Sequence, residues 1–321
     1  MRRLVGTRAL HAVVILIAVA VLTFALVHLA PGDACHRNLD TRVISPATER
    51  ACMQRLHLDR PVVAQFGFYL RDMLHLDFGR SFTTDEPVTA RLARALPNTI
   101  LLMGLALITS FALGIAVALL QSYNPRAGHP LAWLLLLAYA LPDFWAAQLA
   151  LLIFAYLLPI FPPGGVASFD VGYMSGLSAM LDRLHHLWLP WLTLTLVTAA
   201  SVARFQHAAL RDVGHEDWVR TARAKGVSES AILFHHALRN ALGPVITLFG
   251  TALPAVVGGA VFVEKVFSWP GVGALAVDAV TERDAPVVIA CVILGAVAVV
   301  IGSLVADILA GLADPRLRPS A

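Results

Sequence analysis

The amino-acid sequence predicts an all-α protein that crosses a membrane with six transmembrane helices. Of its 321 residues, 58% are hydrophobic and only 14% are charged, whereas soluble domains carry about 25% charged residues. The mean hydropathy is +0.73. Six stretches approach the roughly 20 apolar residues that a spanning helix needs. These stretches are residues 9–30, 98–121, 131–158, 187–203, 243–263 and 286–309.

The first apolar stretch follows Arg2, Arg3 and Arg8, as the core of a secretory signal peptide would. Its apolar run is longer than the 7–15 residues of such a core, and no clear small-x-small cleavage site follows it. We therefore expect residues 1–30 to form a cytoplasmic N-terminus and a retained first transmembrane helix.

An even number of spans places both termini on one side of the membrane, and the distribution of Arg and Lys selects that side. With the N-terminus in the cytoplasm, the inner segments hold twelve Arg and Lys residues and the two short outer loops hold three. The rule does not govern a loop as long as 31–97, so that loop is left out of the comparison. We expect cytoplasmic termini, an extracytoplasmic helical loop at 31–97, a core of five transmembrane helices at 98–311 and a cytoplasmic tail at 312–321.

The segment between the fourth and fifth apolar stretches, residues 204–242, is polar, charged and rich in helix formers. The Glu-Asp pair at 216–217 favours a helix start, because negative charge suits the N-terminal end of a helix dipole. Gly226 suits the position after a helix end, and Ser228 suits the cap of a second helix, which we expect to end near Leu242. Connections in helix bundles usually have 2–8 residues. A segment of nearly forty residues with helices of its own is therefore expected to dock onto a cytoplasmic partner, although a plain connector remains the alternative.

The sequence disfavours several classes of function. Its two lysines, Lys225 and Lys265, both lie outside any GxxxxGK[ST] motif, so ATP would have to be hydrolysed by another chain. G-x-S-x-G and H-E-x-x-H motifs are absent, and we expect neither catalytic activity nor a cofactor. The cysteines form no CxxC or Cys/His cluster, and the neighbouring histidines at 185–186 and 235–236 are poorly placed to chelate together, so we expect no metal site.

Two motifs in the cytoplasmic segment carry a family resemblance. RTARAKG (220–226) followed by HALRNAL (236–242) resembles the permease loop of ATP-binding cassette (ABC) importers of the dipeptide, oligopeptide and nickel branch. The broader family has Glu-Ala-Ala where this chain has Arg-Thr-Ala at 220–222, and Leu-Pro where it has Leu-Arg at 238–239. Further similar motifs are LVHLAPGD (26–33), LHLDRP (56–61), LHLDFGRSF (74–82), ALPDFW (140–145), HHLWLPWLTL (185–194), GGAVFVEKVFSWPGVG (258–273), RDAPVV (283–288) and DPRLRP (314–319).

The resemblance implies a permease subunit of a peptide importer in the bacterial cytoplasmic (inner) membrane. It also implies several partners: a second similar permease, two ABC ATPase subunits or domains, and an extracytoplasmic peptide-binding protein. The residues expected to couple the chain to the ATPase are Thr221, Ala222, Arg223, Lys225 and Gly226. For Arg223 and Lys225, contact with lipid headgroups is the alternative. Import of nickel or a nickel chelate remains open, as does a proton-coupled secondary carrier working through Asp143.

Asp143 is an acidic residue near the middle of the third apolar stretch, which is interrupted by Pro142-Asp143. A carboxylate inside a membrane is energetically expensive, so it should face a cavity or a polar partner. It is therefore either a group lining the translocation pathway or a buried aspartate bonded within the bundle.

The outer loop 31–97 is expected to contain three helices. One runs from Ser45-Pro46 to about His57, one starts at Pro61, and one starts near Pro87 and leads into the second apolar stretch. The loop either docks the binding protein or only covers the outer ends of the spans. Charge swaps at Asp72, Asp77 and Arg80 distinguish these two interpretations.

Cys35 and Cys52 both lie in the outer loop, on the oxidising side of the membrane. A disulfide between them is possible, but sequence alone does not show whether their Cα atoms come close enough.

Overall fold

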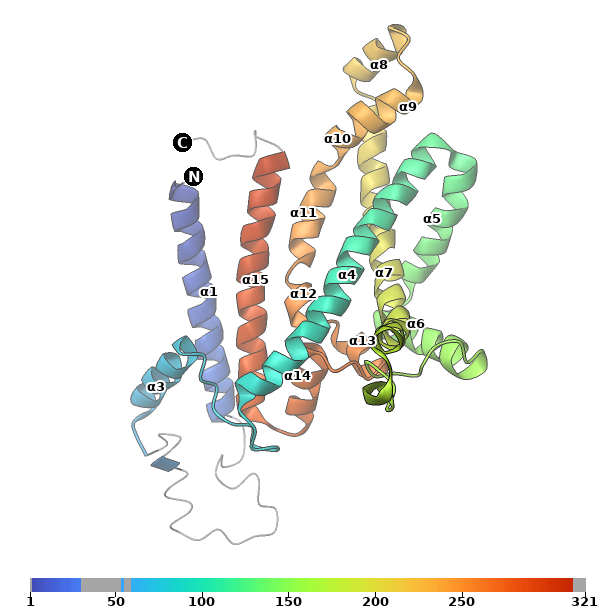
Figure 1. Ribbon diagram of the computed structural model, residues 1–321. Helices are drawn as coiled ribbons and strands as arrows, with labels where there is room; N and C mark the ends of the chain where they lie inside the picture. The colour runs from blue at the N-terminus through green and yellow to red at the C-terminus, as the bar shows by residue number, and fades with distance from the viewer. Residues whose placement is uncertain (1, 30–52, 55–58, 314–321) are drawn as a thin grey trace. The chain divides into compact units, whose positions relative to one another are not determined.

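The computed structural model describes residues 2–29, 53–54 and 59–313, and this part of the chain is helical with no β-strand. Figure 1 shows the arrangement of its helices. In chain order they are α1 (Arg2–Leu29), α3 (Val62–Leu74), α4 (Val88–Tyr123), α5 (Pro125–Ala140), α6 (Asp143–Leu151), the π-helix η1 (Leu152–Leu157), the 3₁₀-helix η2 (Val171–Tyr173), α7 (Gly176–Gly214), α8 (Asp217–Ala224), α9 (Glu229–Ala231), the π-helix η3 (Ile232–Ala237), α10 (Leu238–Ala241), α11 (Gly243–Ala252), α12 (Ala255–Gly258), α13 (Val261–Val266), α14 (Val272–Thr281) and α15 (Ala285–Ala313).

Four helical segments among the described residues are long and apolar enough to cross a membrane. They are Val88–Tyr123, Gly176–Gly214, Gly243–Val266 and Ala285–Leu309. The pair formed by α5 and Asp143–Leu157 would be a fifth if its two arms make one broken span, and α1 contains a shorter apolar segment, Leu10–Leu26. The all-helical membrane class predicted from the sequence is therefore confirmed.

The described chain divides into two compact units. In the unit made of residues 97–274 and 298–313, α7 is central because α5, α6, α10, α11 and α13 all pack against it. One buried cluster joins Leu102 of α4 to Leu187 of α7 and Phe267 after α13. Glycines allow the closest helix contacts in this unit. A Cβ atom on Gly250 of α11 would lie 2.2 Å from the Cβ of Ala306 in α15, so only the smallest residue fits there.

The other unit consists of residues 2–96 and 275–297. Within it, α1 and α3 pack through aromatic rings: the centroid of Phe24 lies 5.2 Å from that of Phe66 and 5.7 Å from that of Tyr69. The hydroxyl groups of Thr23 and Tyr69 are also hydrogen-bonded at 3.0 Å. Burial raises the pKa of Tyr69.

The third predicted stretch, residues 131–158, is broken in the structure at Pro142-Asp143, the interruption that its sequence contains. The two arms meet at a bend of 104° between Ala140 and Asp143. Leu141 adopts an extended backbone (φ −88°, ψ 138°), because a residue before proline is disfavoured in the α conformation. Asp143 is therefore the first residue of the second arm, at the break between the two arms.

The helix that contains the fourth predicted span, residues 187–203, is longer than that span. Helix α7 has 39 residues and continues past Arg204 to Gly214. The apolar run ends at Arg204, but the backbone hydrogen bonding of α7 continues through the helix-forming residues that follow it, up to Gly214. At its start, the Ser175 hydroxyl accepts a hydrogen bond from the Ser178 amide.

The helices predicted in the outer loop are partly tested. Helix α3 begins directly after Pro61, and α4 begins directly after Pro87, as predicted. The helix predicted from Ser45 to about His57 lies outside the described residues, apart from Met53 and Gln54, which are helical.

Candidate functional site: the α8–α9 hairpin

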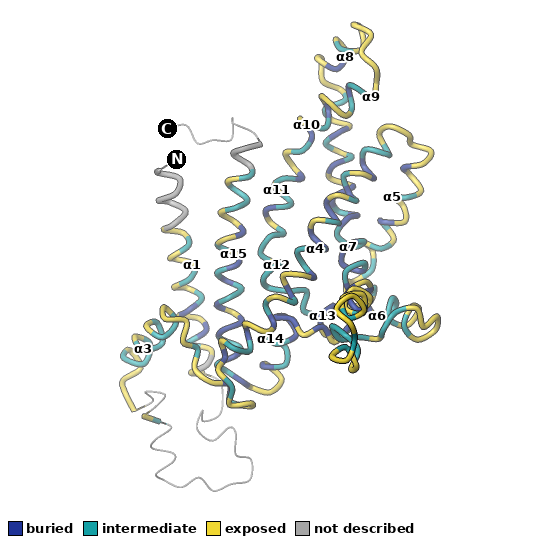
Figure 2. The backbone as a smooth tube through the Cα atoms, in the orientation of Figure 1, coloured by how far each residue is buried: buried dark blue, intermediate teal, exposed yellow. Residues whose placement is uncertain are grey.

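The candidate site is a helical hairpin that follows α7 and is formed by α8, a turn at Gly226 and α9. Figure 1 shows it projecting beyond the ends of α4, α5 and α7. Figure 2 shows the turn and most of α8 as exposed. Within α8 only Val219 is buried. The hairpin therefore presents most of its surface outward.

Helix α8 starts where the sequence predicts. Glu216 is its N-cap residue, with an extended backbone, and Asp217 provides negative charge in the first turn. The Thr221 hydroxyl donates to the backbone oxygen of Asp217 at 3.0 Å, so this side chain is engaged with its own helix.

Helix α8 ends at Gly226 in a Schellman motif. The Val227 amide donates to the Ala222 carbonyl at 3.1 Å, and the Gly226 amide donates to the Arg223 carbonyl at 3.0 Å. Gly226 has a φ of +77°, which disfavours residues with a Cβ. The predicted position of the glycine is confirmed. Glycine is favoured there by the backbone conformation and not by a lack of space, because a Cβ added there would have no atom within 4 Å.

The second arm of the hairpin begins at Ser228, also as predicted. Its hydroxyl accepts a hydrogen bond from the Ala231 amide at 3.3 Å. After α9 the chain continues as η3, whose Ile232 and Ala237 are buried, and then as α10. The second predicted helix is thus continuous to Ala241, and its central part is a π-helix.

An ion pair joins the two arms across the glycine turn. Arg223 Nε donates to Glu229 Oε1 at 2.6 Å, and Arg223 Nη2 donates to Glu229 Oε2 at 3.1 Å. The hydrogen bonds from Arg223 lower the pKa of the Glu229 carboxyl and raise that of the guanidinium. Sequence reasoning missed this partner, although two opposite charges flanking a predicted glycine turn were a usable signal.

The five predicted coupling residues therefore lie together around one turn. Thr221, Arg223, Lys225 and Gly226 are exposed, and Ala222 is half-buried. Of these five residues, Arg223 forms the ion pair with Glu229 of the opposite arm.

Asp143 lies far along the chain from the hairpin, as the first residue of α6. Pro142 precedes it as the N-cap residue, and Asp143 is exposed at this helix start. Negative charge is favourable there because of the helix dipole.

In the outer loop, the charged side chains of Asp77 and Arg80 bond to residues close to them in the sequence. The Asp77 carboxylate accepts a hydrogen bond from the Gly79 amide at 3.0 Å. Arg80 Nε donates to Asp85 Oδ1 at 2.9 Å. A charge swap at Arg80 would therefore also break this local pair. Cys35 and Cys52 lie outside the described residues.

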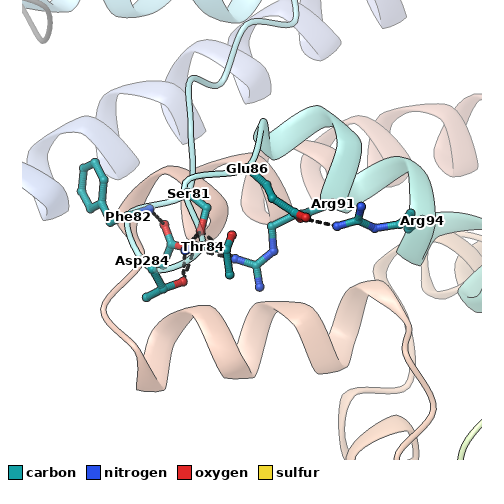
Figure 3. A network of polar contacts seen from close by, with 8 residues as sticks. Ser81, Phe82, Thr84, Glu86, Arg91, Arg94 and Asp284 are labelled. Carbon is teal, nitrogen blue, oxygen red and sulfur yellow. Dashed lines mark hydrogen bonds and ion pairs between the residues drawn. The ribbon is translucent and has the colours of Figure 1, made fainter. Parts of the chain in front are cut away.

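Two buried carboxylates explain motifs whose roles the sequence left open. The first is Asp284, whose side chain is fully buried. Its carboxylate accepts hydrogen bonds from the Ser81 hydroxyl, the Phe82 amide at 3.0 Å and Arg91 at 3.1 Å (Figure 3). It therefore ties the RDAPVV motif to the LHLDFGRSF motif, some 200 residues earlier in the chain.

The second buried carboxylate is Glu264, in the motif at 258–273. It accepts hydrogen bonds from the Thr99 hydroxyl at 2.9 Å and from the Ala274 amide at 2.9 Å. A Cβ on Gly271 would lie 2.4 Å from its carboxyl carbon. The glycines of this motif thus make room for a buried carboxyl group, whose oxygens need hydrogen-bond donors.

The fold and the hairpin define a helical membrane protein with a structured, outward-projecting connection between two apolar segments. Comparison with known proteins agrees with this class. Residues 93–319 match the family described as binding-protein-dependent transport system inner membrane component, and residues 1–103 match the N-terminal component of the same systems. The chain belongs to this family of inner-membrane transport permeases.

Several curated relatives are similar over nearly the whole chain. The oligopeptide transport system permease protein AppB of Bacillus subtilis is 36% identical over 97% of this chain and 98% of its own length. The di/tripeptide transport system permease protein DppB of Pseudomonas aeruginosa is 34% identical over 94% of each chain. The glutathione transport system permease protein GsiC of Salmonella choleraesuis is 38% identical over 97% of each chain.

Proposed function

We propose that the chain is a permease subunit of an ATP-driven ABC importer for di- or oligopeptides. The observation that carries this proposal is the exposed α8–α9 hairpin on a chain of this family. The cargo is inferred from the relatives, which are named as permeases for oligopeptides, for di- and tripeptides and for glutathione. The chain forms half of the translocation pathway, and a second similar permease forms the other half.

The hairpin transmits the motion of a partner ATPase to the transmembrane helices. Thr221, Ala222, Arg223, Lys225 and Gly226 form its contact surface. The Schellman turn and the Arg223–Glu229 pair support this role, because they fix the shape of a surface that has few buried contacts of its own. Helix α7 precedes the hairpin, and η3 and α10 follow it, so closure of two ATPases would move these helices as rigid bodies.

The chain crosses the membrane six times, with both termini in the cytoplasm. Helix α1 is the first span and the bent pair α5–α6 is the third. The excess of Arg and Lys in the segments assigned to the cytoplasm supports this orientation. Residues 31–97 then face the exterior, where a peptide-binding protein delivers cargo.

Asp143 contributes to the translocation pathway. Its exposure at the start of α6 and its position at a bend within apolar sequence support this role. An Asp143→Asn variant is expected to change the relative uptake of peptides with a free and a blocked amino terminus. Unchanged uptake of both peptides would contradict the role.

The function is tested by purifying the tagged full chain under mild conditions with its co-eluting subunits and reconstituting it in vesicles. Uptake of a labelled dipeptide should need ATP, a co-purified ATPase and the binding protein. Nickel uptake without peptide uptake would instead support a nickel importer. Peptide uptake that persists without ATP but stops when the proton gradient is dissipated would support a secondary carrier.

A further inference from the structure

A cavity of about 930 Å³ lies between α5 and α7, next to the end of α4. Its lining residues follow one face of each helix. On α7 they include Arg204, His207 and Arg211, at the i, i+3 and i+7 spacing that places side chains on one face. On α5 they include His129 and Trp133, which are four residues apart. The cavity is therefore an elongated groove parallel to the helices.

A tight helix contact lies at one end of the groove, beside its lining residue Gln121. A Cβ on Gly128 of α5 would lie 2.3 Å from the backbone nitrogen of Gln121 in α4. The α4–α5 connection at Tyr123–Pro125 is on the same side of this unit as the α8–α9 hairpin (Figure 1). Arg211, three residues before the end of α7, lies at this end, and Arg204 lies about 10 Å deeper, at 1.5 Å per residue.

The charge of the groove is of one sign. Among the described residues that line it, Arg204 and Arg211 are cationic, and none is Asp or Glu. The guanidinium carbon of Arg204 lies 5.7 Å from the centroid of the Tyr139 ring, a cation–π distance. A guanidinium on a transmembrane helix is costly unless an anion or a polar group compensates it, so the groove is suited to an anionic group.

One wall of the groove is apolar and exposed. The side chains of Trp133 and Phe205 are 65% and 54% exposed. Ala132, Leu136 and Ala208 complete this wall. A soluble anion has no apolar part to cover this wall, whereas the acyl chains of a lipid can fill it through van der Waals packing.

From these observations we infer that the α5–α7 groove binds an acidic phospholipid. Its phosphate lies against Arg204 and Arg211, and its acyl chains pack along Trp133 and Phe205. Basic pockets between transmembrane helices are recognised sites for acidic lipid headgroups. This site is separate from the hairpin, and it does not depend on which peptide is transported.

The test uses the full transporter, purified with its co-assembled subunits and equilibrated with equal amounts of phosphatidylglycerol and phosphatidylcholine. Native mass spectrometry then measures the ratio of the two lipids retained. The wild type should retain phosphatidylglycerol preferentially. The Arg204→Gln and Arg211→Gln variants should each lose about fivefold of this preference, from the contribution of one basic residue near a membrane surface.

Two controls make the result specific. Arg126 is an exposed arginine at the same end of α5 that does not line the groove, so Arg126→Gln should keep the full preference. Arg204→Lys keeps the charge and should keep most of it. If Arg204→Gln fails to assemble, Arg211→Gln alone decides the question.

Several outcomes would overturn the inference. Equal retention of both lipids by the wild type, or an equal loss in Arg126→Gln, would show that the groove has no selective role. Displacement of the lipid by a large excess of inorganic phosphate would indicate a soluble-anion site. Release of the second permease from an Arg211→Gln complex would show that the groove is a protein interface.

Discussion

Replacing Gly226 isolates the contribution of the α8–α9 turn to coupling. The residue has a φ of +77°, and a residue with a Cβ pays roughly 1–2 kcal/mol in this left-handed region. Because an added Cβ would have no atom within 4 Å, the cost comes from the backbone and not from a clash. Helix α8 has eight residues, and isolated helices shorter than about 12–15 residues are marginal. The loss should therefore reduce the population of the formed hairpin by about 5- to 30-fold.

A series of substitutions gives an expected order. Asn tolerates the left-handed conformation, Ala less so, and the β-branched Val least. ATP-driven peptide uptake by reconstituted vesicles should therefore fall in the order Gly226, Asn, Ala, Val. The amount of ATPase that co-purifies with the chain should fall in the same order.

Gly214 provides a matched control. It is the last residue of α7, it also has open space around its missing Cβ, and its φ is not positive. Gly214→Ala should leave uptake unchanged, since alanine is a better helix former than glycine by about 1 kcal/mol. If Gly226→Val transports and assembles as well as the wild type, the turn does not carry the coupling.

Three further predictions concern the carboxylates. Asp284→Asn should lower the free energy of unfolding in denaturant by about 3–5 kcal/mol, because it leaves the largely buried Arg91 without its counter-charge. As a control, Glu86→Gln removes an exposed ion pair in the same unit and should cost less than about 1 kcal/mol. Equal losses in the two variants would contradict the role of Asp284. Gly271→Ala should lower the melting temperature, because the added Cβ would lie 2.5 Å from both carboxyl oxygens of Glu264. An unchanged melting temperature would show that the site has room for a Cβ. The pKa of Glu229 is lowered from 4.5 by its hydrogen bonds, so the stability that its pair contributes is present above about pH 4.5 and is lost as the pH falls through the lowered value. Hydrogen exchange of the hairpin amides, corrected for the intrinsic rate, should show this loss in the wild type and not in Glu229→Gln.

Local chemistry made much of the hairpin predictable. The start of α8 at Glu216, the turn at Gly226 and the cap at Ser228 each follow from preferences that act within a few residues. The apolar spans in α4 and α15 are also predictable, because the length and composition of the stretches 98–121 and 286–309 are sufficient to predict them. The extent of α7 was underestimated, because a charged residue ends an apolar run without ending a helix.

The sequence by itself determined the membrane class, the position of the hairpin and the proline-containing interruption near Asp143, because each depends on hydrophobicity or on neighbouring residues. The tertiary structure alone decided the 104° bend, the burial of Asp284 and Glu264 and the groove beside Arg204. A carboxylate and its donors, or two faces of one groove, come from segments tens to hundreds of residues apart. Their proximity depends on how the helices pack, and no local preference encodes that packing.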